Sequence, residues 1–394
     1  MSSVVRTLGA VSFAALVGIV ACDVGRVPRA FRADLGSSSA AAGGTGGQGA
    51  GGDDGGGLID DECVGDGLCG TDLIEVVFDR PNVYFVFDRS GSMVTPEGGP
   101  APAFSRFNRL RDASVAVVED LGPLINVGLA LFPAGGADGC AAGGEVMPVT
   151  PGDKPGASAT LEAFASALDV VPDGGTPIAA TLDGLRPRLA GLPGRTIVML
   201  VTDGGPNCNA AASCDIGACQ ANIDGVCPDP QTNCCAPSDL DFGPRLCVDE
   251  PATVAALEAI AAAGVETYVI AIPGAESYGA VLDAMAVAGG VPQEGGATDY
   301  FRVDDLSGIE AVLRNIAAGA VSCTIPLQAP SPDPMRTNVY FDCDVVPFSA
   351  SGGWTWEGEN FDAITLHGVA CQRLKNGEVG EVQVLTGCPI DAPR

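Results

Sequence analysis

Short apolar runs alternate with amphipathic segments between Asn82 and Gly319, and this alternation limits the possible folds more than any other feature of the sequence. Strand-length runs separated by helix-length segments are the order expected of parallel strands joined by crossover helices. The sequence therefore predicts an α/β fold with a doubly wound, mostly parallel sheet flanked by helices. Continuous apolar runs predict buried strands at 83–87, 127–132, 197–201, 267–272 and 300–303, and an edge strand near 146–149.

Three of the intervening segments carry apolar residues at helical spacing. Such stripes indicate helices packed on the sheet, and core packing explains them without a ligand. The stripes consist of Leu110, Ala113, Val117 and Leu121, then Ile178, Leu182, Leu185 and Leu189, and finally Leu306, Ile309, Leu313 and Ile316.

The N-terminus has the pattern of an export signal. Arg6 precedes an uncharged apolar stretch at 8–20, which suits a signal peptide and is short for a membrane-spanning helix. The stretch leads into Ile-Val-Ala-Cys at 19–22, which resembles a bacterial lipobox. We therefore expect residues 1–22 to be a lipoprotein signal whose Cys22 is acylated, so that a lipid anchors the protein in the cell envelope or on the cell surface. An ordinary signal peptide or a weak membrane anchor is the alternative.

The segment that follows is too poor in apolar side chains to fold. Residues 23–57, rich in Gly, Ser and Ala, predict a flexible linker, and residues 58–79 form a lead-in that contains Cys63 and Cys69. Across the whole chain, 49 acidic residues against 20 basic ones give a formal charge of −29, which repels nucleic acid. Cations and basic groups are the partners that this charge favours.

Fifteen cysteines in an exported chain favour disulfides. Without Cys22, fourteen remain to pair. A zinc site is the alternative, but the chain has no Cys-x-x-Cys motif, and its only histidine is His367. A Cys-rich insertion at 204–250 contains an odd number of cysteines, so Cys140 is expected to supply the eighth. The seven cysteines of the insertion are Cys208, Cys214, Cys219, Cys227, Cys234, Cys235 and Cys247.

Beyond residue 320 the pattern changes to prolines and short extended runs. Residues 321–394 predict a small β-rich, disulfide-bonded region with runs at 338–341, 364–369 and 381–385, and a candidate hairpin turn at Asn376-Gly377. Its two tryptophans fit a core better than a binding surface. Its cysteines are Cys323, Cys343, Cys371 and Cys388.

Oxygen-bearing side chains follow two of the predicted strands and precede one helix. Asp88, Ser90 and Ser92 alternate directly after the first strand, Thr176 precedes Pro177, and Asp203 follows the strand at 197–201. Loops at the carboxyl ends of parallel strands meet at the crevice where ligands bind. Alone, Thr176 would be interpreted as a helix N-cap.

Taken together in this order, Asp88-x-Ser90-x-Ser92, Thr176 and Asp203 resemble the metal-ion-dependent adhesion site of von Willebrand factor A-type (VWA) domains, and the resemblance covers 80–320. It implies a divalent cation, Mg²⁺ before Mn²⁺ or Ca²⁺, because these ions prefer oxygen ligands. The resemblance further implies that the serines and the threonine contact the ion, that the aspartates act largely through water, and that a protein ligand supplies a carboxylate.

Three classes of function remain at this stage. The expected one is a non-enzymatic binding or adhesion module, with no catalytic residues. A metal-dependent hydrolytic enzyme is the first alternative, although the sequence contains no nucleophile elbow, Walker loop or His-bearing metal motif. A structural envelope scaffold with a stabilising metal is the second.

Overall fold

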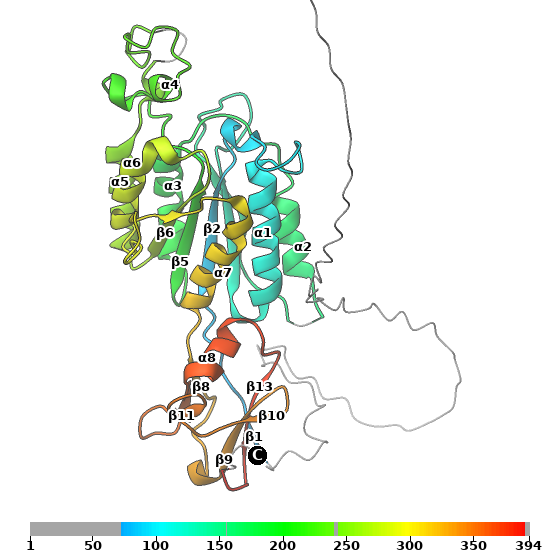
Figure 1. Cartoon of the computed structure of the whole chain (residues 1–394). Coiled ribbons are helices and arrows are strands. Elements are labelled where there is room, and N and C mark those ends of the chain that lie inside the picture. The colour runs from blue at the N-terminus through cyan, green and yellow to red at the C-terminus, as the bar shows by residue number, and fades with distance from the viewer. Residues whose placement is uncertain (1–71, 155, 240–242, 391–394) are drawn as a thin grey trace, which may run out of the picture. The chain divides into compact units, whose positions relative to one another are not determined.

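The computed structural model describes residues 72–154, 156–239 and 243–390. Its largest sheet has six strands in the order β4-β3-β2-β5-β6-β7 (Figure 1). All neighbouring strands run parallel except β4, which is antiparallel to β3 at one edge. The strands are β2 (Asn82–Asp88), β3 (Asn126–Phe132), β4 (Gly144–Pro151), β5 (Thr196–Thr202), β6 (Glu266–Ala271) and β7 (Phe301–Arg302).

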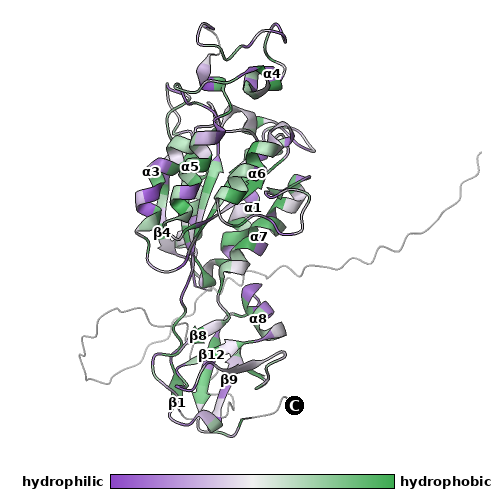
Figure 2. Cartoon of the chain, turned by 90° about the vertical axis from the view of Figure 1, so that its left-hand side faces the viewer, coloured by the Kyte–Doolittle hydropathy of each residue, from purple (hydrophilic) through white to green (hydrophobic). Residues whose placement is uncertain are grey.

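Helices cover both faces of this sheet, because alternate residues of its strands point to opposite sides. Phe85 of β2 belongs to one apolar cluster and Tyr84 to the other. The first cluster includes buried residues of α1 (Arg106–Leu121), α2 (Ala159–Ala167) and α7 (Ile309–Ala320), and the second includes those of α3 (Ile178–Ala190), α5 (Glu250–Ala261) and α6 (Gly279–Ala288). In Figure 2 the strands of this sheet are mostly hydrophobic, whereas the helices around it carry both hydrophobic and hydrophilic residues.

The mixed α/β class with a mostly parallel sheet is therefore confirmed. The strand order reverses between β2 and β5: from β2 the chain fills one half of the sheet, and from β5 it fills the other. Such a reversal defines the topological switch point of a doubly wound sheet. Asp88 ends β2 and Asp203 follows β5, so both candidate carboxylates lie at this point.

The Cys-rich segment at 204–250 contains little regular structure in the part that is described, with α4 (Gln220–Ile223) as its helix. Disulfides hold it together: Cys214–Cys247, Cys219–Cys235 and Cys227–Cys234 lie within the segment, and Cys208 pairs with Cys140 outside it. Three sulfur atoms lie within 4.8 Å of one another, those of Cys214, Cys235 and Cys247. Because all three are in disulfides, no thiolate there is free to bind zinc.

The last part of the chain forms two small antiparallel sheets. One has the order β1-β13-β9-β10 and the other β11-β12-β8. The first therefore includes β1, which precedes the central sheet in sequence. Their strands are β1 (Asp72–Ile74), β8 (Thr324–Pro326), β9 (Thr337–Phe341), β10 (Asp344–Val346), β11 (Trp354–Trp356), β12 (Ala363–Leu366) and β13 (Val382–Thr386). Trp354 is fully buried, as expected of a core residue.

Two details of this region differ from the prediction. The extended run expected at 364–369 ends at Leu366, and helix α8 (Gly368–Lys375) follows. The hairpin turn expected at Asn376-Gly377 is wrong, because Asn376 is the C-cap of α8 and Gly377 follows it with a φ of 71°. A glycine with positive φ commonly ends a helix. A disulfide joins Cys323 to Cys371, and Cys343 and Cys388 are also disulfide-bonded.

The predictions for the N-terminus fall outside the described residues. These are the signal and lipid-bearing Cys22, the linker at 23–57, and Cys63 and Cys69. Among the helices of the described residues, none has the length and apolar character needed to span a membrane.

Candidate metal centre

Asp88 is held at the end of β2 by two hydrogen bonds. One carboxylate oxygen, Oδ1, accepts the backbone N–H of Ser90 at 2.7 Å, and Oδ2 accepts the hydroxyl of Thr202 at 2.6 Å. The side chain has no solvent exposure. These contacts fix the carboxylate between the central strands and turn the chain into the short helix η1 (Gly91–Val94) that carries Ser92.

Asp203, on the loop after β5, receives contacts from two elements. Its Oδ1 accepts the Ser92 hydroxyl at 2.7 Å, and its Oδ2 accepts Nη1 of Arg106 at 2.8 Å. Arg106 is the first residue of α1 and also pairs with Glu97 at 2.8 Å. The site therefore contains one basic side chain beside its two buried aspartates.

The hydroxyl protons of Ser90 and Ser92 have settled directions. The two Oγ atoms are 3.1 Å apart, and the hydroxyl of Ser92 donates its single proton to Asp203. Ser90 must therefore be the donor between them. Both protons point along the chain of hydrogen bonds toward Asp203, so the remaining lone pairs of these oxygens are available to a cation.

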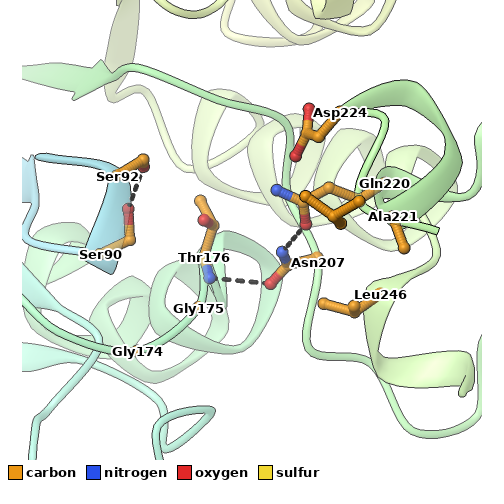
Figure 3. Close-up of a pocket in the computed structure, with 11 residues that line it drawn as sticks. Ser90, Ser92, Gly174, Gly175, Thr176, Asn207, Gln220, Ala221, Asp224 and Leu246 are labelled. Atoms are coloured by element: carbon orange, nitrogen blue, oxygen red, sulfur yellow. Dashed lines mark hydrogen bonds between the residues drawn. The ribbon is translucent and has the colours of Figure 1, made fainter. Parts of the chain in front are cut away.

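Thr176 joins the serines from a different loop. Together with Ser90 and Ser92 it lines a pocket of about 210 Å³ (Figure 3). The capping alternative for Thr176 is wrong: α3 begins at Ile178, its N-cap is Pro177, and no side chain caps it. The structure thus brings all five candidate residues to the switch point, with Ser90, Ser92 and Thr176 on the pocket and the two aspartates behind the serines.

The electrostatics of the site favour an added positive charge. Burial and then the charge of Asp203 raise the pKa of Asp88 to about 7, and burial also raises the pKa of Asp203. Arg106 offsets only part of this cost because Glu97 shares it. Buried anions without full compensation are costly, and a divalent ion would supply the missing charge.

The donor set fits a hard divalent cation. Carboxylates and hydroxyls are the ligand types that Mg²⁺ and Ca²⁺ prefer, and the site offers no thiolate or imidazole. Ser90, Ser92 and Thr176 would hold the ion from the pocket side. Asp88 and Asp203 would act from behind, because their oxygens already orient Ser90, Ser92 and Thr202.

Several residues of this site were not identified from the sequence. Thr202 and Arg106 contact the two aspartates, and Asn207 and Gln220 line the pocket. Thr202 directly precedes Asp203, so its place at a strand end was the one available signal. The others come from a helix start and an irregular loop, where spacing carries no information on contacts.

Fold and site together define a doubly wound α/β domain with an acidic, hydroxyl-lined pocket at its switch point. No protein-family model matches the chain, and no curated protein matches it. Solved structures do show similarity. The PilB minor pilin from Streptococcus sanguinis is 20% identical with a TM-score of 0.42, and the match covers 64% of this chain and 62% of that one.

Two other similar structures differ more in size. The pilus adhesin SpaC from Lactobacillus rhamnosus GG in its open conformation is 18% identical, with a TM-score of 0.43 over 77% of this chain and 38% of its own. The SpRpn10 VWA domain is 12% identical, with a TM-score of 0.34 over 58% of this chain and 93% of its own. The chain thus spans about two fifths of the adhesin and three fifths of the pilin. All three TM-scores are below 0.5.

Proposed function

We propose that this protein is an envelope-anchored binding module that takes a carboxylate of a protein ligand through a divalent cation at the switch-point site. The observation that carries the proposal is the pair of buried, undercompensated carboxylates, Asp88 and Asp203, next to two serine hydroxyls that line a pocket. A bound cation would supply Lewis acidity for an acidic ligand. The chain's own residues hold and orient that ion.

Charge arithmetic explains why the site would still attract an anion once an ion is bound. The aspartates contribute two negative charges, and Arg106 is shared between Asp203 and Glu97. The three hydroxyl ligands add no formal charge, so a divalent ion remains electrophilic toward a carboxylate. Mg²⁺ is the proposed ion, with Mn²⁺ or Ca²⁺ as substitutes.

The anchor is the second part of the proposal and depends on the sequence at 1–57. Acylated Cys22 would fix the chain to a membrane, and the Gly/Ser-rich linker would hold the folded part away from its surface. Mass spectrometry of membrane fractions tests this directly. A mature N-terminus other than a lipid-modified Cys22 would contradict it.

Calorimetric titration of Mg²⁺, Mn²⁺ and Ca²⁺ into the detergent-solubilised whole chain, after removal of metal with EDTA, tests the site. We expect binding by the wild type and its loss in Asp88→Ala and Ser92→Ala. Ser114→Ala is the matched control, because Ser114 is a buried serine of α1 that donates to the Arg111 carbonyl outside the site. Folded wild-type protein that binds none of the three ions would contradict the proposal.

The other two classes of function give different results. A hydrolase would show turnover in a broad substrate screen that Asp88→Ala abolishes. A scaffold with a structural metal would lose thermal stability in EDTA without releasing a bound partner. The proposed module instead releases its ligand when the metal is removed, and it turns over no substrate.

A further inference from the structure

The pocket beside the hydroxyl ligands has a second side, formed by the Cys-rich segment. Ser90, Ser92 and the loop at 174–176 provide one side, and the residues facing them come from 204–250 (Figure 3). Those residues are Asn207, Gln220, Ala221, Asp224, Val226 and Leu246. An insertion that could simply hold itself together therefore also borders the space that a ligand must enter.

Hydrogen bonds settle which way the amides of this second side point. The backbone N–H of Thr176 donates to Oδ1 of Asn207 at 2.8 Å, so the Asn207 amide nitrogen must face the other way. There it donates to Oε1 of Gln220. The Gln220 oxygen is thereby used, and the Gln220 amide nitrogen is left as the group that faces the pocket.

The direction of the Gln220 amide matters because the facing side of the pocket holds the hydroxyl ligands. In Figure 3 the nitrogen of Gln220 points toward the side on which Ser92 and Thr176 lie. On the same side of the pocket, the hydroxyl of Tyr278 donates to Asp224 at 2.7 Å and so orients its carboxylate. The N–H groups of the Gln220 amide can donate to an anion in the pocket.

A close backbone approach and two disulfides hold the Cys-rich segment against the loop at 174–176. A Cβ on Gly175 would lie 2.6 Å from the Cys208 sulfur and 2.9 Å from Asn207 Oδ1, so a glycine is required for this approach. The Cys140–Cys208 disulfide ties the same point, and Cys219–Cys235 fixes the residue before Gln220. Preorganised donors lose less entropy when a ligand binds.

We infer that the Cys-rich segment is the ligand-selecting half of the site, an inference that rests on the function proposed above. Gln220 donates an N–H to the carboxylate oxygen of the ligand that the cation does not take. Asp224, exposed at the rim, favours a basic residue beside the ligand's acidic one and repels a second acidic residue. The ligand is therefore a protein segment in which an acidic and a basic side chain are neighbours.

Ligand-detected NMR with two dipeptides, N-acetyl-Asp-Lys-amide and N-acetyl-Asp-Glu-amide, tests the inference on the Mg²⁺-loaded whole chain. We expect the wild type to bind Asp-Lys roughly threefold more tightly than Asp-Glu, the size typical of one exposed charge pair. Gln220→Met should weaken binding of both dipeptides about 10-fold, as loss of a hydrogen bond to a charged group does. Asp224→Asn should abolish the preference while retaining binding.

Two controls separate this inference from the proposed metal site. Calorimetric Mg²⁺ affinity should be unchanged in Gln220→Met and Asp224→Asn, and Glu258→Gln, which removes an exposed charge outside the pocket, should leave the dipeptide preference intact. Wild type that fails to bind Mg²⁺ overturns the proposed function. Wild type that binds Mg²⁺ but neither dipeptide, or dipeptide binding that neither pocket substitution changes, overturns the role of the segment alone.

Discussion

Replacement of Asp88 by asparagine tests whether excess negative charge destabilises the site when no cation is bound. Burial and Asp203 raise the pKa of Asp88 from 3.8 to about 7. A carboxyl whose pKa is higher in the folded state contributes stability below its unfolded pKa, and this stability is lost as the pH rises through the folded pKa. At about pH 8 the ionised group therefore costs about 4 kcal/mol relative to a neutral one, and at about pH 5 about 1.5 kcal/mol.

Asparagine removes the charge and can keep the hydrogen bonds. Its Oδ1 accepts the Ser90 N–H as the carboxylate does, and its amide nitrogen donates to the Thr202 hydroxyl oxygen. The Thr202 proton then turns to the carbonyl of Gly204, which already lies 3.2 Å away. The substitution thus changes charge with little change in packing.

Urea unfolding in EDTA, at about pH 8 and about pH 5, measures the effect. Asp88→Asn should raise the free energy of unfolding by up to about 4 kcal/mol at the higher pH and by about 1.5 kcal/mol at the lower. Mg²⁺ at about 100 times its dissociation constant should add about 2.7 kcal/mol to the wild type and little to the variant.

Asp305→Asn is the control, because it removes a carboxyl whose pKa is shifted in the opposite direction to that of Asp88. Hydrogen bonds from Ser307 lower the pKa of the exposed Asp305, so its contribution is present above its unfolded pKa and is lost as the pH falls. Asp305→Asn should therefore lose the same small amount of stability at both pH values, because both lie above the unfolded pKa of this carboxyl, which is 3.8. If metal-free Asp88→Asn were instead destabilised equally at both pH values, the excess-charge argument would be refuted.

Three further changes follow from the contacts described. Arg106→Met leaves Asp203 without its basic partner, so the free energy of unfolding of the metal-free protein at about pH 8 should fall by about 3 kcal/mol. Calorimetry of the same variant should show tighter Mg²⁺ binding. The Cys140–Cys208 disulfide closes a loop with a sequence separation of 68. Replacing both cysteines by alanine should lower the free energy of unfolding, measured in denaturant, by about 4 kcal/mol. Gly175→Ala should cost about 2 kcal/mol through overpacking and weaken dipeptide binding more than Mg²⁺ binding; equal loss of both would contradict the separation of the two halves of the site.

The central sheet could be predicted because its strands are buried on both faces. Such strands appear in the sequence as continuous apolar runs, and β2 and β5 are buried at every position. The predicted edge strand at 146–149 corresponds to β4, whose observed bounds are wider because most of its positions are exposed or partly buried and form no continuous apolar run. The apolar stripes of α1, α3 and α7 also lie in the core.

The site was predictable only as far as strand ends identify it. Asp88 and Asp203 end or follow strands, so topology alone brings them together. The role of Arg106 could not be inferred from the sequence. Arg106 is the first residue of an amphipathic helix, and its partner Asp203 lies 97 positions further along the chain. Gln220 depends on the path of a disulfide-bonded loop, and that path follows from cysteine pairings that the sequence leaves open.

Near the C-terminus, local pattern was a weaker guide. The residues at 364–369 look extended, yet Val369 lies in α8 and is 62% exposed, so its apolar side chain does not mark a buried strand. Asn-Gly suits both a tight hairpin and a helix end, because both require positive φ at the glycine. Packing of the neighbouring elements decides between them.

The place of β2 in the sheet has a mechanical consequence. A pulling force applied at the N-terminal side of the chain is transmitted along the backbone through β1 into β2. Strand β2 ends at Asp88, next to the proposed ligand site. β2 is hydrogen-bonded along its length to β3 on one side and β5 on the other. Force between the N-terminus and a captured ligand would therefore act along this strand, and its two ladders of backbone hydrogen bonds would share the load rather than open one bond at a time.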